Sequence, residues 1–198
     1  MPERKRTATI SPCPAGDFIL YCDTSALIKL LLEEKYSNKV REFADKCDTI
    51  AVCRITWAEA KAALNRHERQ QTEKLSSSLS VAKNLITRYS QQIECRDNIH
   101  LIVQEVHSLI KEVHQVAHQS LEELWRDCAL IDLSNNILNK AGEFSAQFCL
   151  KGYDSVQLAA AHEFQLEIGQ SSSLLFASFD QQLNNAAAKL KMEIIANF

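Results

Sequence analysis

The sequence contains no apolar run of about 18–20 residues, the length that a membrane-spanning helix needs. Its first segment, MPERKRTATISPCPAGD, also lacks the apolar core of a signal peptide. We therefore expect a cytoplasmic protein without a membrane partner. Residues 1–17 are predicted to be a flexible tail. For its Arg4-Lys5-Arg6 cluster we favour a solvated stretch over the alternative of a nucleic-acid-binding arm.

The seven cysteines include no C-x-x-C pair, and their number is odd. Both facts speak against a disulfide scaffold and against a zinc site. Because several of these cysteines lie inside apolar runs, we expect them to be small buried hydrophobic residues in a reducing cytosol.

A global positive charge is also missing, since the formal net charge is −3. Any nucleic acid would have to be held by local features of the surface rather than by the field of the whole protein. The length of 198 residues is typical of one domain with a substantial core, because about 70% of the unfolded surface is buried at this size.

Neither glycine nor proline occurs between Gln71 and Arg126, and this segment is strongly helical in composition. We predict two long amphipathic helices packed as a hairpin, with a break near Cys95-Arg96-Asp97-Asn98. The packing stripes are predicted to be Leu79, Ala82, Leu85 and Ile86 on one helix, and Ile102, Val106, Leu109, Val113 and Val116 on the other.

Four histidines follow one line of the second long helix, at positions 100, 107, 114 and 118. His114 and His118 have the spacing at which two histidines can share a metal ion. No acid or cysteine joins them at a known ligand spacing, so we favour a solvated polar face.

Short apolar runs alternate with helical patterns in the rest of the chain, which predicts a parallel sheet with helices on both faces. We treat residues 18–198 as one α/β domain with residues 71–126 as a helical insertion. The predicted strands are 18–22, 49–53, 128–133, 174–178 and 193–195, and the predicted helices are 25–34, 37–46, 56–70, 135–148, 154–164 and 181–191.

Four acidic residues stand at the starts of four predicted helices: Asp23, Glu59, Asp154 and Asp180. Each could simply cap its helix, because Asp is a preferred N-cap and Thr56-x-x-Glu59 matches a capping box. A parallel sheet, however, gathers strand ends and helix starts at one edge. Four carboxylates there would repel, and a cation bound by oxygen ligands, Mg²⁺ or Mn²⁺, would relieve that repulsion. Such a site predicts hydrolysis of a phosphodiester.

These residues resemble the motifs of the PIN-domain ribonucleases, especially the VapC-type toxins of bacterial toxin–antitoxin modules. The segments that resemble the family's motifs are DTSAL around Asp23, TWAEAKAAL around Glu59, GYDSVQLAAA around Asp154 and FASFDQQLNNAAAKLKMEII around Asp180. They occur in the family's order, within residues 18–70 and 130–195. The insertion at 71–126 is longer than in compact VapC-type toxins.

The resemblance implies a Mg²⁺- or Mn²⁺-dependent endoribonuclease, blocked by a cognate antitoxin protein and commonly dimeric. Asp23, Glu59, Asp154 and Asp180 would be the catalytic and metal-binding residues. Ser25 and Ser178 would support them through hydrogen bonds, Ser178 standing where the family often has Thr. Arg54 and Lys151, near two of the acids in sequence, are our candidates for binding RNA phosphates.

Two other functions fit parts of the same pattern. An aspartyl phosphotransferase of the haloacid dehalogenase type would use Asp23 as nucleophile. Those enzymes have a D-x-D motif at their first strand, whereas this chain has Ser25 in place of the second aspartate. A PIN-like module that only binds RNA or protein is the other alternative, and the presence of all four acids argues against it.

Overall fold

The computed structural model describes residues 18–89, 94–169 and 172–195. The predicted tail, residues 1–17, lies outside them. The chain divides into two compact units, one reaching to Ala60 and resuming at Leu124, the other spanning Lys61–Glu123. No helix in the described ranges is both long and apolar enough to cross a membrane.

The first unit contains a five-stranded sheet whose pairings are all parallel, in the order β3-β2-β1-β4-β5. This arrangement confirms the predicted α/β class. The strands are β1 (Phe18–Cys22), β2 (Thr49–Cys53), β3 (Ala129–Ile131), β4 (Ser173–Ala177) and β5 (Glu193–Ile194).

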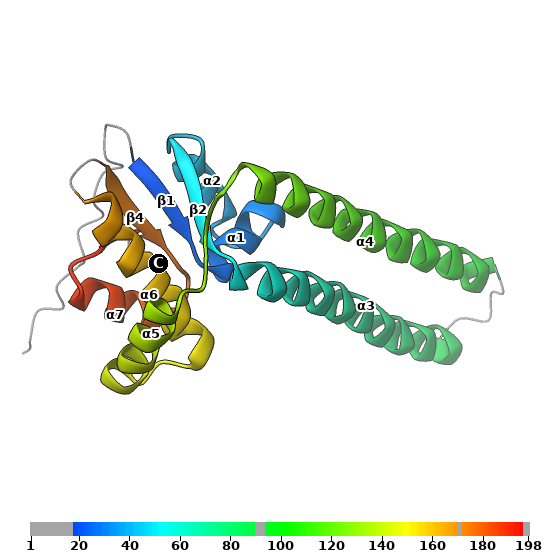
Figure 1. Ribbon diagram of the computed structural model, residues 1–198. Helices are drawn as coiled ribbons and strands as arrows, with labels where there is room; N and C mark the ends of the chain where they lie inside the picture. Colours follow the sequence, from blue (N-terminus) through cyan, green and yellow to red (C-terminus); the bar gives the residue numbers. More distant parts are fainter. Residues whose placement is uncertain (1–17, 90–93, 170–171, 196–198) are drawn as a thin grey trace, which may run out of the picture. The chain divides into compact units, whose positions relative to one another are not determined.

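Helices cover the sheet in two layers (Figure 1). One layer packs on an apolar cluster in which the rings of Tyr21 and Phe176 stack with centroids 5.5 Å apart. That layer consists of α5 (Asn135–Phe148), α6 (Gly152–Ile168) and α7 (Gln181–Lys189). The shorter helices α1 (Thr24–Leu31) and α2 (Ser37–Ala44) lie on the other side. Both faces of the central strands are therefore buried, as a parallel sheet requires.

Strand β1 is the point at which the order of the sheet reverses, because β2 lies on one side of it and β4 on the other. Loops leaving such neighbouring strands diverge and open a crevice at the carboxyl ends of the strands. Cys22 is in register with Ala177, so the residues that follow β1 and β4 meet at this crevice. The fold thus places Asp23 and Ser178 at its topological switch point.

The second unit consists of the greater part of two long antiparallel helices, α3 (Ile55–Tyr89) and α4 (Glu94–Asp127), which lie side by side (Figure 1). The predicted hairpin is confirmed, but two of its details are wrong. Helix α3 does not end near Gln70, and the predicted break at 95–98 lies within α4. Without glycine or proline, nothing in either segment interrupts the helical hydrogen bonds.

The predicted packing stripe of α4 is also wrong. Ile102, Leu109, Val113 and Val116 are all exposed. The residues of α4 that are buried instead are His114, Ala117 and Leu121, and His114 is only 1% exposed. His114 therefore does not belong to a solvated face, contrary to the prediction, whereas His107 and His118 are partly exposed. Leu85, Ile86 and His100 have no described side chains.

His114 is buried because its imidazole is satisfied on both sides. Its Nδ1 lies 2.7 Å from the carbonyl oxygen of Ile110, which can only accept, so Nδ1 donates there. Its Nε2 then accepts from Nδ1 of His67 at 2.9 Å. This pair of histidines connects α3 and α4 within the hairpin.

Five cysteines whose side chains the structure describes are free thiols: Cys22, Cys47, Cys53, Cys128 and Cys149. Cys22 and Cys53 are buried, as the sequence predicted, and burial raises the pKa of both thiols. Cys149 departs from the prediction, since it is exposed at the end of α5 with a left-handed backbone (φ 56°).

Candidate active site

Asp23 follows β1 directly and caps α1, so the simple capping role is real. Its Oδ1 accepts hydrogen bonds from the backbone N–H of Ala26 and from Oγ of Ser25, both at 2.8 Å. Its Oδ2 accepts a hydrogen bond at 2.6 Å from Oγ of Ser178, the residue that follows β4. A cap needs only the first of these contacts. The side chain is 5% exposed, so the structure buries this carboxyl between two strand ends.

Burial raises the pKa of Asp23 to about 6. The hydrogen bonds from Ser178, Ala26 and Ser25 lower that pKa, while the nearby negative charge of Glu59 raises it further. Desolvation therefore outweighs three donors, which leaves a carboxyl group that is costly to ionise at neutral pH. A positive charge brought to this position would remove that cost.

The end of β4 is held against the start of α1 through two serine hydroxyls. Ser25 Oγ accepts from the N–H of Phe179 at 2.8 Å, and Ser178 Oγ accepts from the N–H of Asp180 at 3.0 Å. Asp180 in turn caps α7 by accepting from the N–H of Leu183 at 2.8 Å. Each serine thus links a carboxylate to the loop that carries another acid.

Glu59 lies in the first turns of α3, and its Oε2 is held by two donors. Thr24 Oγ1 donates at 2.6 Å, and Gln157 Nε2 donates at 2.8 Å. Thr56 lies inside α3 rather than before it, so the predicted capping box is wrong. Its hydroxyl instead accepts from Gln157 Nε2 at 2.9 Å.

Gln157 is the centre of this polar network, although the sequence analysis did not single it out. The side chain is 3% exposed, and its Oε1 accepts from the hydroxyl of the fully buried Tyr21 at 2.9 Å. The oxygen of the Gln157 carboxamide therefore accepts a hydrogen bond from β1, and its nitrogen donates hydrogen bonds to α3. No spacing rule would have found it, because its partners lie 98 and 136 residues away in sequence.

Asp154 lies in the first turn of α6, and Lys151, not Asp154, occupies the N-cap position. Burial raises the pKa of Asp154, and the charges of Asp180 and Glu59 raise it further, while Lys151 lowers it. Two of the other three acids therefore lie close enough to raise the pKa of Asp154.

The four predicted acids are linked by their mutual repulsion, Asp23 to Glu59, Glu59 to Asp154, and Asp154 to Asp180. Carboxylate oxygens are the ligands that hard divalent cations prefer. In the described part of the chain, however, no three acidic, histidine or cysteine side chains already stand close enough together to hold a metal ion. The donor chemistry fits such an ion, and the side chains would have to close around it.

The two predicted RNA-binding residues, Lys151 and Arg54, differ in the acidic residue that each one faces. Lys151 is exposed beside Asp154, where its charge acts on that carboxyl. The side chain of Arg54 forms an ion pair with Asp132, which is also exposed. Arg54 would have to exchange this partner in order to contact a phosphate.

Comparison with known proteins gives three findings. The family model described as "PIN domain" matches residues 20–189. Two Mycobacterium tuberculosis proteins, ribonuclease VapC45 (strain CDC 1551 / Oshkosh) and ribonuclease VapC49 (strain ATCC 25618 / H37Rv), are each 24% identical to this chain over 169 residues, 85% of this chain and 89% of theirs. The crystal structure of VapBC2 from Rickettsia felis bound to a promoter DNA fragment aligns with 91% of this chain and 99% of that one, at 11% identity and a TM-score of 0.45.

Proposed function

Because the chain belongs to the PIN-domain family, we propose that it is a metal-dependent endoribonuclease and the toxin of a toxin–antitoxin pair. Two relatives that match most of its length are named as VapC ribonucleases. The observation that carries the proposal is the buried carboxyl of Asp23, whose pKa is raised to about 6 at an edge shared with three further acids.

Asp23, Asp154 and Asp180 are the proposed ligands of Mg²⁺ or Mn²⁺, with Glu59 as a further ligand or as the base that orients water. When bound, the ion would supply the positive charge that these acids lack, activate water and stabilise negative charge on phosphate oxygens. Ser178 and Ser25 hold the Asp23 carboxylate from both of its oxygens. Thr24 and Gln157 fix Glu59 through its Oε2.

The substrate in this proposal is RNA, with Lys151 as the main phosphate contact and Arg54 as a second one after it leaves Asp132. The chain would act in the cytoplasm, and a cognate antitoxin protein would cover the acidic edge. The ribonuclease fold would comprise residues 18–198, with residues 71–126 as an insertion.

The decisive experiment incubates the protein with total RNA and Mg²⁺ or Mn²⁺, with and without EDTA. We expect cleavage that EDTA abolishes. Asp23→Asn should reduce the rate by about 100-fold or more, since a neutral amide replaces the central carboxylate. Asp45→Asn, at an exposed position at the end of α2, is the matched control and should cleave normally.

Retained metal-dependent cleavage in a folded Asp23→Asn protein would contradict the proposal. Absence of both cleavage and Mn²⁺ binding, measured by calorimetry on the wild type, would favour a module that only binds RNA or protein. A phosphoryl group trapped on Asp23 would favour the aspartyl phosphotransferase.

A further inference from the structure

Helix α4 carries two neighbouring lines of side chains, each with the alternating four- and three-residue spacing of a coiled-coil seam. The inner line faces α3 and includes the buried His114, Ala117 and Leu121. The outer line starts one residue earlier, about 100° around the helix. It consists of Ile102, Val106, Leu109, Val113 and Val116.

The outer line is aliphatic throughout, yet most of it faces solvent. Four of its five residues are exposed, from 55% for Val113 to 59% for Val116. Single exposed apolar residues are ordinary, but an aligned series forms a patch, and patches of about 300–600 Å² are often functional. The described hairpin thus satisfies one seam of α4 and leaves a second seam of the same spacing uncovered.

The outer line shares its side of the hairpin with part of α3. Asn65 and His118, 3.2 Å apart, mark the opposite side. Lys74 follows Asn65 by nine residues, and Leu109 precedes His118 by nine, which is about two and a half helical turns in each case. Both side chains therefore point away from the Asn65–His118 contact, to the other side of the hairpin.

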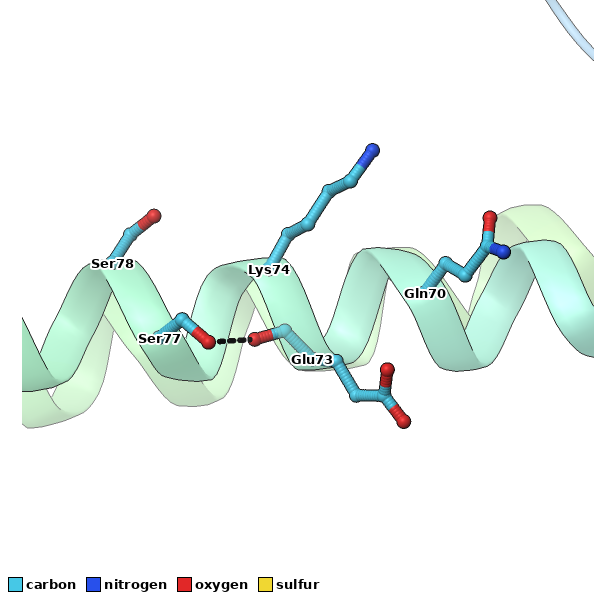
Figure 2. Close-up of a pocket in the computed structure, with 5 residues that line it drawn as sticks. All are labelled: Gln70, Glu73, Lys74, Ser77 and Ser78. Carbon is cyan, nitrogen blue, oxygen red and sulfur yellow. Dashed lines mark hydrogen bonds between the residues drawn. The ribbon is translucent and has the colours of Figure 1, made fainter.

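On that side, α3 offers a shallow depression rather than a ridge. It is lined by Gln70, Glu73, Lys74, Ser77 and Ser78. Figure 2 shows Gln70, Lys74 and Ser78 projecting from the same side of the helix. The short serine side chains leave room there for the larger side chains of an approaching helix.

The charges of this face are complementary to one another. Glu105 and Glu112 are exposed and each precedes an outer-line residue by one position, so both border the line on the flank away from the inner one. His67 and His114 are in contact, which fixes the register of the two antiparallel helices. Lys74 lies seven residues after His67 and His107 seven residues before His114, so Lys74 and His107 lie at the same height along the hairpin. Lys74 is therefore level with the stretch between the two glutamates.

We propose that this face binds the same face of a second copy of this chain. A two-fold axis would place the outer line of each α4 on the α3 depression of the other copy, which forms a four-helix bundle from two hairpins. Lys74 of each copy would then meet Glu105 and Glu112 of the other. An apolar ridge, a shallow depression and opposite charges on one face are what a self-complementary contact requires. None of the residues of this face is among the proposed site residues, so the RNA-cleavage experiment does not test the proposal.

Sedimentation velocity of the full chain over a wide concentration range tests the surface. We expect the wild type to form a reversible assembly of even stoichiometry. Leu109→Glu combined with Val113→Glu should weaken association by about 100-fold or more and halve the mass. Leu166→Glu, at a 64% exposed position on α6, is the matched control and should leave the mass unchanged.

Both altered positions are exposed, so circular dichroism should show a folded variant. A wild type that stays monomeric at every concentration would overturn the proposal. So would a folded double variant with the mass of the wild type.

A charge-exchange experiment separates a second copy from any other partner. Lys74→Glu alone, and Glu105→Lys with Glu112→Lys alone, should each weaken self-association by about tenfold or more, because like charges then meet twice. Mixing the two proteins should restore assembly, since each copy then offers the charge that the other needs. Failure of the mixture to associate, or unaltered association of either variant alone, would overturn the proposed pairing.

Discussion

The two units of this chain both bury polar side chains, but with different partners. In the unit that contains the sheet, Gln157 uses its acceptor on Tyr21 and its donors on Thr56 and Glu59, so one amide serves several segments. In the hairpin, His114 bonds to His67 and to a carbonyl of its own helix. The first network holds a carboxylate that faces a candidate site, whereas the second holds only two helices together. Under the proposed function, the buried polar network of the sheet unit positions a site residue, whereas the buried histidine pair only joins two helices.

The largest effect on stability should come from Gln157→Leu, which tests whether the network serves Glu59. Leucine leaves the buried Tyr21 hydroxyl without its acceptor and Glu59 without one donor, so the free energy of unfolding should fall by about 3 kcal/mol or more. RNA cleavage should fall on the order of 100-fold, in kcat rather than KM, because Glu59 is no longer held in position.

Gln147→Leu, on the exposed face of α5, is the matched control and should change neither quantity by much. Wild-type kinetics in a folded Gln157→Leu protein would show that the network is purely structural.

The next effect concerns Asp23 and the pH dependence of stability, measured by denaturant unfolding in EDTA. The pKa of Asp23 is raised from 3.8 to about 6 in the folded state, so the folded protein binds more protons than the unfolded one in this interval. Stability should therefore fall as pH rises from about 4 to about 7, by roughly 2–3 kcal/mol at 1.36 kcal/mol per pKa unit.

Asp23→Asn should flatten most of this slope and should be the more stable protein above pH 6, while being inactive. Parallel curves for the wild type and the variant would show that Asp23 does not carry the predicted cost. Adding Mn²⁺ should stabilise the wild type and leave the variant unchanged.

The smallest effect is expected in the hairpin. His114→Leu replaces a buried imidazole by an aliphatic side chain of similar size, and the half-buried His67 can turn its N–H to water. The free energy of unfolding should change by less than about 1 kcal/mol, with RNA cleavage unaltered. Leu121→Ala, in the same line of α4, should lower the free energy of unfolding by about 2–5 kcal/mol. This variant is the positive control, because it shows that the unfolding measurement detects a loss of packing between α3 and α4. A loss for His114→Leu as large as that for Gln157→Leu would remove the contrast between the two units.

Much of the sheet unit could be predicted because local signals agreed there. The bounds of β1, β2 and α5 are those predicted, since apolar runs end at strong capping residues such as Asp23 and Ser134. The alternation of strands and helices also predicted a common edge for the acids. Ser178, which bonds Asp23 from the end of β4, was among the predicted supporting residues. Gln157 of α6, which bonds Glu59, was not predicted, because an amide has no spacing signature.

The hairpin was predicted less well for a physical reason. Alternating spacings of four and three residues occur twice on α4, one position apart, and spacing alone cannot tell which line packs against α3. We chose the more apolar line, Ile102 to Val116, whereas the structure buries the line that contains His114. The continuity of α3 was not predicted, because the sequence was divided at Gln70 into two helices although no glycine or proline separates them.

The contact between Asp23 and Ser178 joins residues that are 155 positions apart. During synthesis, the ribosome must therefore add most of the fold after Asp23 before β4, the strand that Ser178 follows, can pair with β1. Until then the carboxyl has Ser25 and Ala26 beside it, but neither the opposite strand end nor Asp180. A protein that is proposed to cut RNA would thus lack its complete set of acids through most of its own translation, and the strand order alone provides that delay.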